Sequence, residues 1–173
     1  MLELVLGGAR SGKSRYAEEV ASGSGMAVTY VATASAGDAE MAERIARHRQ
    51  RRPGTWRLAE VSRDLASHLV ALAEPQRLVL VDCLTLWLAN LLDENDPLPW
   101  QRERDNLLAT LPGLPGTVVM VSNETGLGVV PMGRLTRRFI DEAGWLHQDL
   151  ARICHRVTFL VAGLPLHLKG TEP

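Results

Sequence analysis

The stretch Gly7-Gly8-Ala9-Arg10-Ser11-Gly12-Lys13-Ser14 directly follows a short apolar run, Leu-Glu-Leu-Val-Leu, at residues 2–6. Its spacing, Gly-x4-Gly-Lys-Ser, is typical of a phosphate-binding loop, in which backbone N–H groups surround the phosphates and the lysine reaches the β- and γ-oxygens. A helix that begins after such a loop directs the positive end of its dipole at the bound anion. Because a strand pattern precedes the loop and a helical pattern follows it, we predict that all eight residues bind a nucleoside triphosphate.

Two side chains are predicted to hold a Mg²⁺ ion together with that triphosphate. The hydroxyl of Ser14 belongs to the loop itself, and Asp82 ends the continuous apolar run 78–81. Parallel strands present ligands at their carboxyl ends, which is where we expect Asp82 to lie. Asp82 is also placed to cap a helix through residues 86–92, and the two roles are compatible.

Apolar runs of strand length alternate along the chain with segments of helical periodicity. The expected strands cover residues 2–6, 27–32, 78–82, 117–121 and 157–162. The expected helices cover residues 14–20, 38–48, 62–73, 101–111 and 135–153, with surface loops at 93–100 and 125–133. Continuous apolar strands separated by helices indicate a mainly parallel sheet with helices on both faces. We therefore predict one α/β P-loop domain over residues 1–173.

Charge and hydropathy disfavour several classes of protein. A formal net charge of −1 argues against a nucleic-acid-binding surface. The longest apolar run, at residues 78–92, is interrupted by Asp82 and Asn90 and is too short for membrane insertion. The N-terminus has no basic region before an apolar stretch, and the two cysteines have no metal-ligand spacing. We therefore expect a cytoplasmic protein.

An arginine-rich segment surrounds His48. Five arginines lie within residues 44–52, and guanidinium groups match the geometry of phosphate oxygens. A solvated basic face is the commoner explanation of such a charge run. His48 lies on the apolar face of a predicted helix, so its imidazole is either packed in the core or a catalytic nucleophile. Glu60 and Glu124 end predicted segments, where each is a general base, a base or ribose contact, or a surface acid.

Four segments taken together resemble one enzyme family. They are Gly7 to Ser14, Arg44-Ile45-x-x-His48-Arg49, Arg57-Leu58-Ala59-Glu60, and Val121-Ser122-Asn123-Glu124-x-Gly126-x-Gly128-x-Val130-Pro131. From residue 2 to Lys169 the chain is similar to the bifunctional adenosylcobinamide kinase/adenosylcobinamide-phosphate guanylyltransferases of cobalamin biosynthesis. Many kinases share the first segment, whereas the segments around His48 and Glu124 are far more restrictive.

The resemblance implies two reactions on a corrinoid substrate. In the first, the γ-phosphate of ATP or GTP goes to the hydroxyl of the cobinamide aminopropanol arm. In the second, GTP donates GMP to a histidine, which passes the guanylyl group to cobinamide phosphate and so forms adenosyl-GDP-cobinamide. By the motif, the histidine that carries GMP is His48.

The resemblance also implies a RecA-like fold, a homotrimer and further nucleotide contacts. Those contacts would come from Thr33, Ala34, Ser35, Arg49, Gln50, Arg51, Arg52, Glu60 and Asp82. One position departs from the family pattern: His147 stands where an asparagine is expected in many relatives.

Three other functions stay open on the residues alone. A P-loop kinase with a single activity needs Lys13 and Asp82 but no nucleophilic histidine. A regulatory GTPase usually carries an Asn/Thr-Lys-x-Asp motif, and neither of the two lysines, Lys13 and Lys169, lies in one. A RecA-like DNA-binding ATPase is disfavoured by the charge balance.

Overall fold

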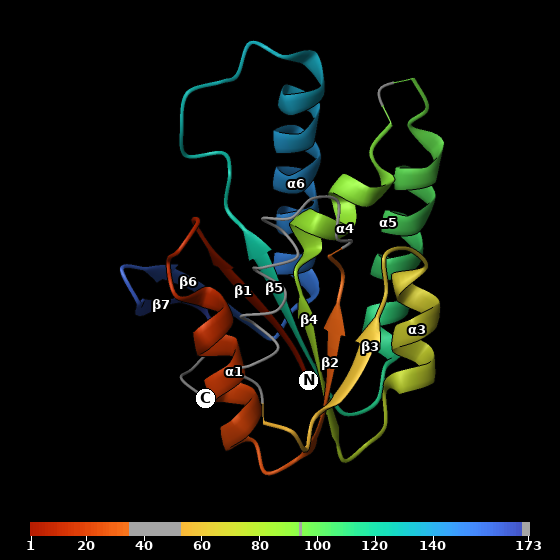
Figure 1. Cartoon of the computed structure of the whole chain (residues 1–173), viewed down its shortest axis with the longest axis vertical. Coiled ribbons are helices and arrows are strands. Elements are labelled where there is room, and N and C mark those ends of the chain that lie inside the picture. Colours follow the sequence, from red (N-terminus) through yellow and green to blue (C-terminus); the bar gives the residue numbers. More distant parts are fainter. Residues whose placement is uncertain (35–52, 94, 171–173) are drawn as a thin grey trace.

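The computed structural model describes residues 1–34, 53–93 and 95–170, which contain a seven-stranded sheet (Figure 1). The strand order across the sheet is β3-β2-β4-β5-β1-β6-β7. Neighbouring strands are parallel except for β6 and β7, which are antiparallel. The strands are β1 (Leu2–Gly7), β2 (Ala27–Ala32), β3 (Arg57–Glu60), β4 (Arg77–Asp82), β5 (Thr117–Asn123), β6 (Arg156–Val161) and β7 (Leu164–Lys169).

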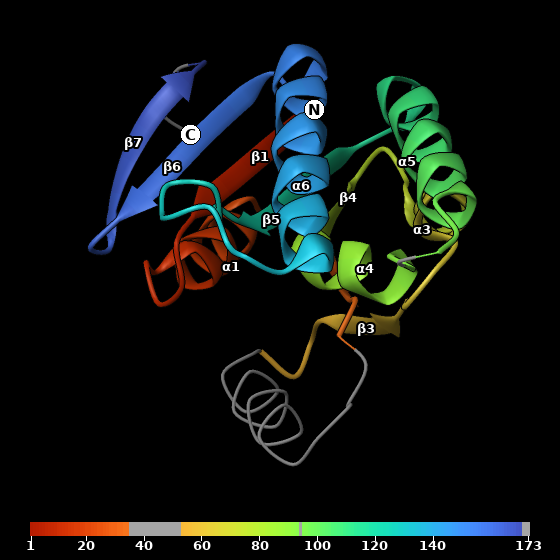
Figure 2. The same cartoon turned by 90° about the horizontal axis from the view of Figure 1, so that it is seen from above.

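Helices cover both faces of this sheet, as predicted (Figure 2). Side chains alternate between the two faces of a strand. Accordingly, Leu4 and Leu6 of β1 pack with most of the helices, and Val5 packs with α1 on the other face. The helices are α1 (Lys13–Gly23), α3 (Leu65–Leu72), α4 (Leu84–Leu91), α5 (Leu98–Thr110) and α6 (Arg134–Ile153), with a short 3-10 turn at Leu111–Gly113. The predicted α/β architecture with a mainly parallel sheet is confirmed.

Two buried tryptophans link the helices α4, α5 and α6, which pack against one another on one face of the sheet. Trp87 of α4 and Trp100 of α5 are fully buried, and their ring centroids lie 5.2 Å apart in an edge-to-face arrangement. The indole N–H of Trp100 donates a hydrogen bond of 2.7 Å to Oε2 of Glu142 on α6. This packing fixes α4, and α4 carries side chains that organise the candidate site.

The structure differs from the sequence prediction in three places. α5 begins at Leu98, so the surface loop predicted for residues 93–100 ends earlier; the prolines at 97 and 99 sit at the helix start, where a missing N–H is tolerated. The strands β3 and β7 were not predicted. The prediction relied on continuous apolar runs, which are typical of strands buried on both faces. β3 and β7 lack this pattern because they lie at the two edges of the sheet and are largely exposed. The helix predicted for residues 38–48 lies outside the described residues.

Candidate functional site

The predicted phosphate-binding loop joins the carboxyl end of β1 to the start of α1. β1 ends at Gly7 and α1 begins at Lys13. Two residues of the loop have left-handed backbone angles, Arg10 with φ 58° and Gly12 with φ 95°, and these reverse the chain direction. The Nζ atom of Lys13 donates to the carbonyl of Gly8 at 3.2 Å. Ser14 lies in the first turn of α1, where its hydroxyl can reach a ligand at the helix N-terminus.

The loop also rests on the turn between β6 and β7, and this contact explains two of its glycines. A Cβ atom at Gly7 would lie 2.4 Å from Oγ of Ser11 and 2.9 Å from the carbonyl oxygen of Leu160. At Gly12 it would lie 3.2 Å from Cα of Gly163, whose N–H donates to the Ser11 carbonyl at 2.9 Å. Packing against protein therefore disfavours a side chain at position 7, and the positive φ together with the close contact disfavours one at position 12.

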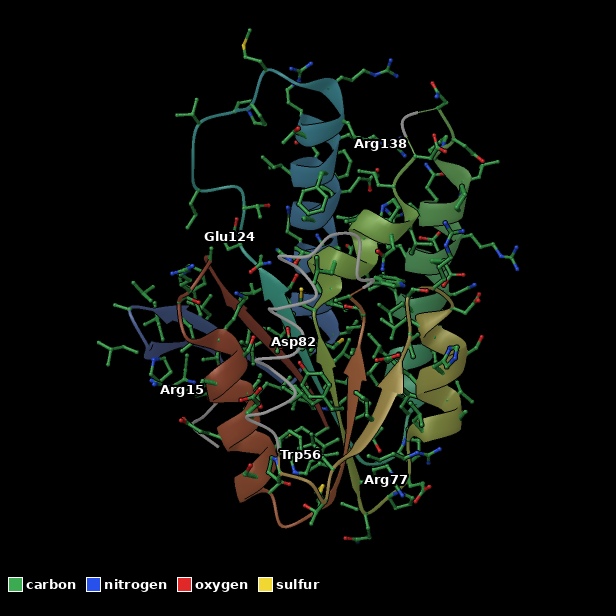
Figure 3. All side chains as sticks on the ribbon, in the orientation of Figure 1. Arg15, Trp56, Arg77, Asp82, Glu124 and Arg138 are labelled. Carbon is green, nitrogen blue, oxygen red and sulfur yellow. The ribbon has the colours of Figure 1, made fainter. Side chains whose placement is uncertain are left out.

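Asp82 lies at the carboxyl end of β4, as predicted (Figure 3). The hydroxyl of Tyr30 donates to its Oδ2 atom at 2.9 Å, and a carboxylate has acceptor capacity beyond this one bond. The alternative interpretation of Asp82 as a helix cap is wrong. The N-cap residue of α4 is Cys83, and the helix has no side-chain cap hydrogen bond from its N-cap residue.

Thr33 joins the ends of β2 and β4 through its side chain. Its fully buried hydroxyl donates to the carbonyl of Cys83 at 2.7 Å and accepts from the Cys83 N–H at 2.9 Å. Asn90 of α4 donates to the Thr33 carbonyl at 2.8 Å. These contacts give Thr33 a part in holding the carboxyl edge, while its predicted contact with a nucleotide stays a prediction. The same holds for the neighbouring Ala34.

Of the other predicted nucleotide contacts, the structure describes only Glu60. Glu60 ends β3 opposite Ala32 of β2, at the edge of the sheet farthest from β6 and β7. Several predicted residues, including the catalytic histidine, lie outside the described part of the chain, and their roles stay predictions. They are Ser35, His48, Arg49, Gln50, Arg51 and Arg52.

The carboxyl end of β5 carries polar residues for which the sequence suggested no definite role. β5 lies between β1 and β4, and Asn123 is in register with Gly7. The side-chain amide of Asn123 donates to Oγ1 of Thr85 on α4 at 3.0 Å. The N–H of Glu124 donates to the Gly7 carbonyl at 3.0 Å. The sequence does contain a pattern that indicates a site here. Polar residues 122–124 directly follow a buried apolar run, and parallel strands bind ligands at this end.

Burial perturbs two titratable groups near this edge. Burial lowers the pKa of the His147 imidazole, against the opposing effect of the Glu124 carboxylate. Burial, reinforced by the charge of Asp82, raises the pKa of the Cys83 thiol to about 11. The thiol is therefore protonated at neutral pH and is no nucleophile. His147 is neutral under the same conditions.

Among the described residues, no helix is both long and apolar enough to cross a bilayer.

Solved structures of low sequence identity share this fold. A RadB recombinase matches with a TM-score of 0.52 and 18% identity, over 91% of this chain and 73% of its own. An ATPase of a bacterial type III secretion system matches with a TM-score of 0.54 and 9% identity, over 92% of this chain and 52% of its own. At such identities the likeness concerns the fold alone, and it confirms the RecA-like P-loop architecture.

Sequence comparisons identify the family. A model described as cobinamide kinase / cobinamide phosphate guanyltransferase matches residues 3–168. The bifunctional adenosylcobalamin biosynthesis protein CobP of Pseudomonas aeruginosa is 61% identical over 100% of this chain and 99% of its own length. The bifunctional adenosylcobalamin biosynthesis protein CobU of Salmonella typhimurium is 41% identical, over 98% of this chain and 100% of its own. The chain therefore belongs to the cobinamide kinase/cobinamide phosphate guanylyltransferase family and is a bifunctional enzyme of adenosylcobalamin biosynthesis.

Proposed function

We propose that the enzyme uses two different nucleophiles for its two reactions, and that the loop at 7–14 holds the triphosphate from which each reaction begins. The observation that carries this proposal is the common position of the loop and of Asp82. Both lie at the carboxyl edge of the sheet, on strands separated only by β5. In the kinase reaction the substrate hydroxyl attacks the γ-phosphorus, and the nucleoside diphosphate leaves.

Ser14 and Asp82 are the residues that would hold Mg²⁺. This ion usually keeps several waters and takes one or two carboxylates together with substrate phosphates. One hydroxyl and one aspartate therefore fit, although the described residues hold no cluster of three or more His, Cys, Asp or Glu ligands. When bound, the ion would neutralise charge on the phosphoryl oxygens.

The second nucleophile is His48. A neutral imidazole is a competent nucleophile near pH 7, and attack on the α-phosphorus of GTP releases pyrophosphate and leaves GMP on the histidine. Cobinamide phosphate then takes the guanylyl group. Donors from the segments on either side would stabilise charge on the phosphoryl oxygens and hold the nucleotide. The donors are Thr33, Ala34, Ser35, Arg49, Gln50, Arg51 and Arg52, while the Glu60 carboxylate, which accepts hydrogen bonds, would contact the base or the ribose.

GTP labelled at either the α- or the γ-phosphate tests whether the two reactions use different nucleophiles. With α-labelled GTP we expect the label to stay on the protein after denaturation, because GMP is covalently bound. With γ-labelled GTP the denatured protein should carry no label, and the label should appear on cobinamide. Absence of α-label on protein that still phosphorylates cobinamide would contradict the histidine intermediate.

We also propose that the enzyme works as a cytoplasmic homotrimer. Apolar side chains on the loop 125–133 support association, because Val129 and Met132 are each 95% exposed. Sedimentation equilibrium should give about three times the 19.0 kDa mass of the chain. A species of single-chain mass at working concentrations would rule out the trimer without affecting the two activities.

A further inference from the structure

A buried histidine and a glutamate face each other beside the phosphate-binding loop. His147 of α6 is 6% exposed, and its Nε2 atom lies 2.8 Å from the hydroxyl of Ser122 on β5. Its other ring nitrogen, Nδ1, has no hydrogen-bond partner among the residues that the structure describes, and it lies 3.8 Å from Oε2 of Glu124. The second carboxylate oxygen of Glu124 accepts from the N–H of Gly126 at 2.6 Å. One oxygen of the carboxylate is thus hydrogen-bonded to the backbone, and the other faces the His147 ring.

The backbone places Glu124 next to the residues predicted to bind the terminal phosphates. The N–H of Glu124 bonds to the carbonyl of Gly7, and the Nζ atom of Lys13 bonds to the carbonyl of Gly8, the next peptide unit. Glu124 directly follows β5, the strand between the loop strand β1 and the Asp82 strand β4 (Figure 3). In the strand order, β5 therefore lies between the strand that leads into the loop and the strand that ends at Asp82, the proposed metal ligand.

The other polar groups at this edge are less suited to accept a proton. Asp82 already accepts from Tyr30 and is the proposed metal ligand. The side chain of Asn123 is an amide, which is no base, and it is bonded to Thr85. Glu60 ends β3, which three other strands separate from β1. Among the carboxylates that the structure describes at the carboxyl edge, Glu124 is therefore the one closest to the loop in the strand order.

We propose that Glu124 is the general base of the kinase reaction and that His147 is a positioning residue, whose imidazole holds the Glu124 carboxylate. In this step the cobinamide hydroxyl oxygen forms a bond to the γ-phosphorus and gives its proton to Glu124. The bond from the γ-phosphorus to the β,γ-bridging oxygen breaks, and its electron pair leaves with the nucleoside diphosphate. Glu124 then releases the proton to solvent. This inference rests on the proposed location of phosphoryl transfer at the loop 7–14.

The geometry suits an enzyme without its substrates. A separation of 3.8 Å is too long for an N–H···O hydrogen bond, which needs about 2.7–3.2 Å, so a shift of roughly 1 Å would close it. Catalytic hydrogen bonds are often long before substrate binds. If the Ser122 hydroxyl donates to Nε2, then Nδ1 carries the proton and points it at Glu124. A neutral His147 therefore orients the carboxylate without taking its charge.

Glu124→Gln tests the base without removing its structural contact. The amide oxygen of glutamine can still accept from Gly126, but the amide cannot take a proton. We expect the kcat for cobinamide phosphorylation to fall by about 10²- to 10⁴-fold, the usual contribution of a general base. The KM for the nucleotide and the yield of GMP adduct from α-labelled GTP should stay close to the wild-type values.

Two results would overturn the assignment of Glu124. One is a kcat for phosphorylation within a few-fold of the wild-type value. The other is an equal loss of phosphorylation and of GMP adduct, because Glu124 would then be a structural residue. Glu124→Asp retains a carboxylate set back by one methylene, and it should phosphorylate cobinamide faster than Glu124→Gln does.

A matched pair of variants tests His147. Asparagine places its amide nitrogen near the position of Nδ1, and glutamine places its own near Nε2. We expect His147→Asn to retain most of the kcat for phosphorylation. His147→Gln keeps the Ser122 contact but not the Glu124 contact, and it should lower kcat with little change in the KM for nucleotide. Equal kcat values for the two variants would remove the positioning role.

Failure of this inference can be told from failure of the proposed kinase site. If Lys13→Ala leaves phosphorylation intact, the reaction does not take place at the loop, and both proposals fall. If Lys13→Ala abolishes phosphorylation while Glu124→Gln does not affect it, the proposed kinase site at the loop is supported and the assignment of Glu124 as the general base is wrong.

Discussion

His48→Ala is expected to abolish the GMP adduct and guanylyl transfer while cobinamide phosphorylation survives. Covalent transfer needs a nucleophile in line with the α-phosphorus, and in the proposed mechanism only His48 supplies one. Phosphorylation uses the substrate's own hydroxyl as the nucleophile and therefore needs no nucleophilic histidine. The measurement is the amount of α-label on denatured protein, compared with the rate of γ-label transfer to cobinamide. His48→Asn is a matched variant of similar polarity, and it should behave in the same way.

The chemical stability of the label identifies the bond. A phosphoramidate is lost rapidly in acid and persists in alkali, because protonation makes the imidazole a good leaving group. The wild-type adduct should show this pattern. An acid-labile adduct on the alanine variant would mean that another histidine is the nucleophile. The remaining candidates are His68, His147, His155 and His167.

A different outcome would change the role of His48 without moving the nucleotide site. If both activities were lost while the circular dichroism spectrum and melting temperature matched the wild type, His48 would be a shared binding residue. The nucleophile would then have to be sought elsewhere.

Lys13→Ala is expected to weaken both reactions, because each begins from a bound triphosphate. Loss of one preorganised electrostatic contact to the reacting group lowers kcat by about 10²- to 10³-fold in comparable sites. We therefore expect kcat/KM for phosphorylation and the rate of GMP adduct formation to fall together. Steady-state kinetics with γ-labelled and α-labelled GTP measure the two effects separately.

The chain offers a matched control, since Lys169 is its other lysine. The Nζ atom of Lys169 donates to the carbonyls of Ala151 and Arg152 near the end of α6, away from the carboxyl edge of the sheet. Lys169→Ala should cost stability of about 1 kcal/mol or less and leave both activities unchanged. Near-normal phosphorylation and adduct formation by Lys13→Ala would show that Lys13 is not at the site.

The architecture follows from local patterns because its central strands are buried on both faces. β1, β2, β4 and β5 each consist of a nearly continuous apolar run. A polar residue or a glycine ends β1, β4 and β5 and directly follows β2. Such runs, separated by helical segments, leave few arrangements other than a parallel sheet. The edge strands β3 and β7 could not be predicted in this way, because exposed residues are under no pressure to be apolar.

The sequence by itself also determined the phosphate-binding loop and the end of β4. Their chemistry depends on residues that are neighbours in the chain, namely glycines, Lys13 and Ser14 in one turn and Asp82 at a strand end. The spacing of these residues along the chain is therefore enough to predict them as candidate site residues. The family resemblance added the guanylyl transfer, because no local pattern distinguishes a nucleophilic His48 from a packed one.

Only the tertiary structure decided what surrounds this local chemistry. Thr33 bonds to Cys83 across 50 positions, and Gly7 is required partly by Leu160 of β6. The pairing of Glu124 with His147 depends on the packing of α6 against β5, whose contacting residues lie far apart in the chain. Spacing along a sequence reports neighbours within one element, whereas a side chain's partner on another element is set by how the two elements pack.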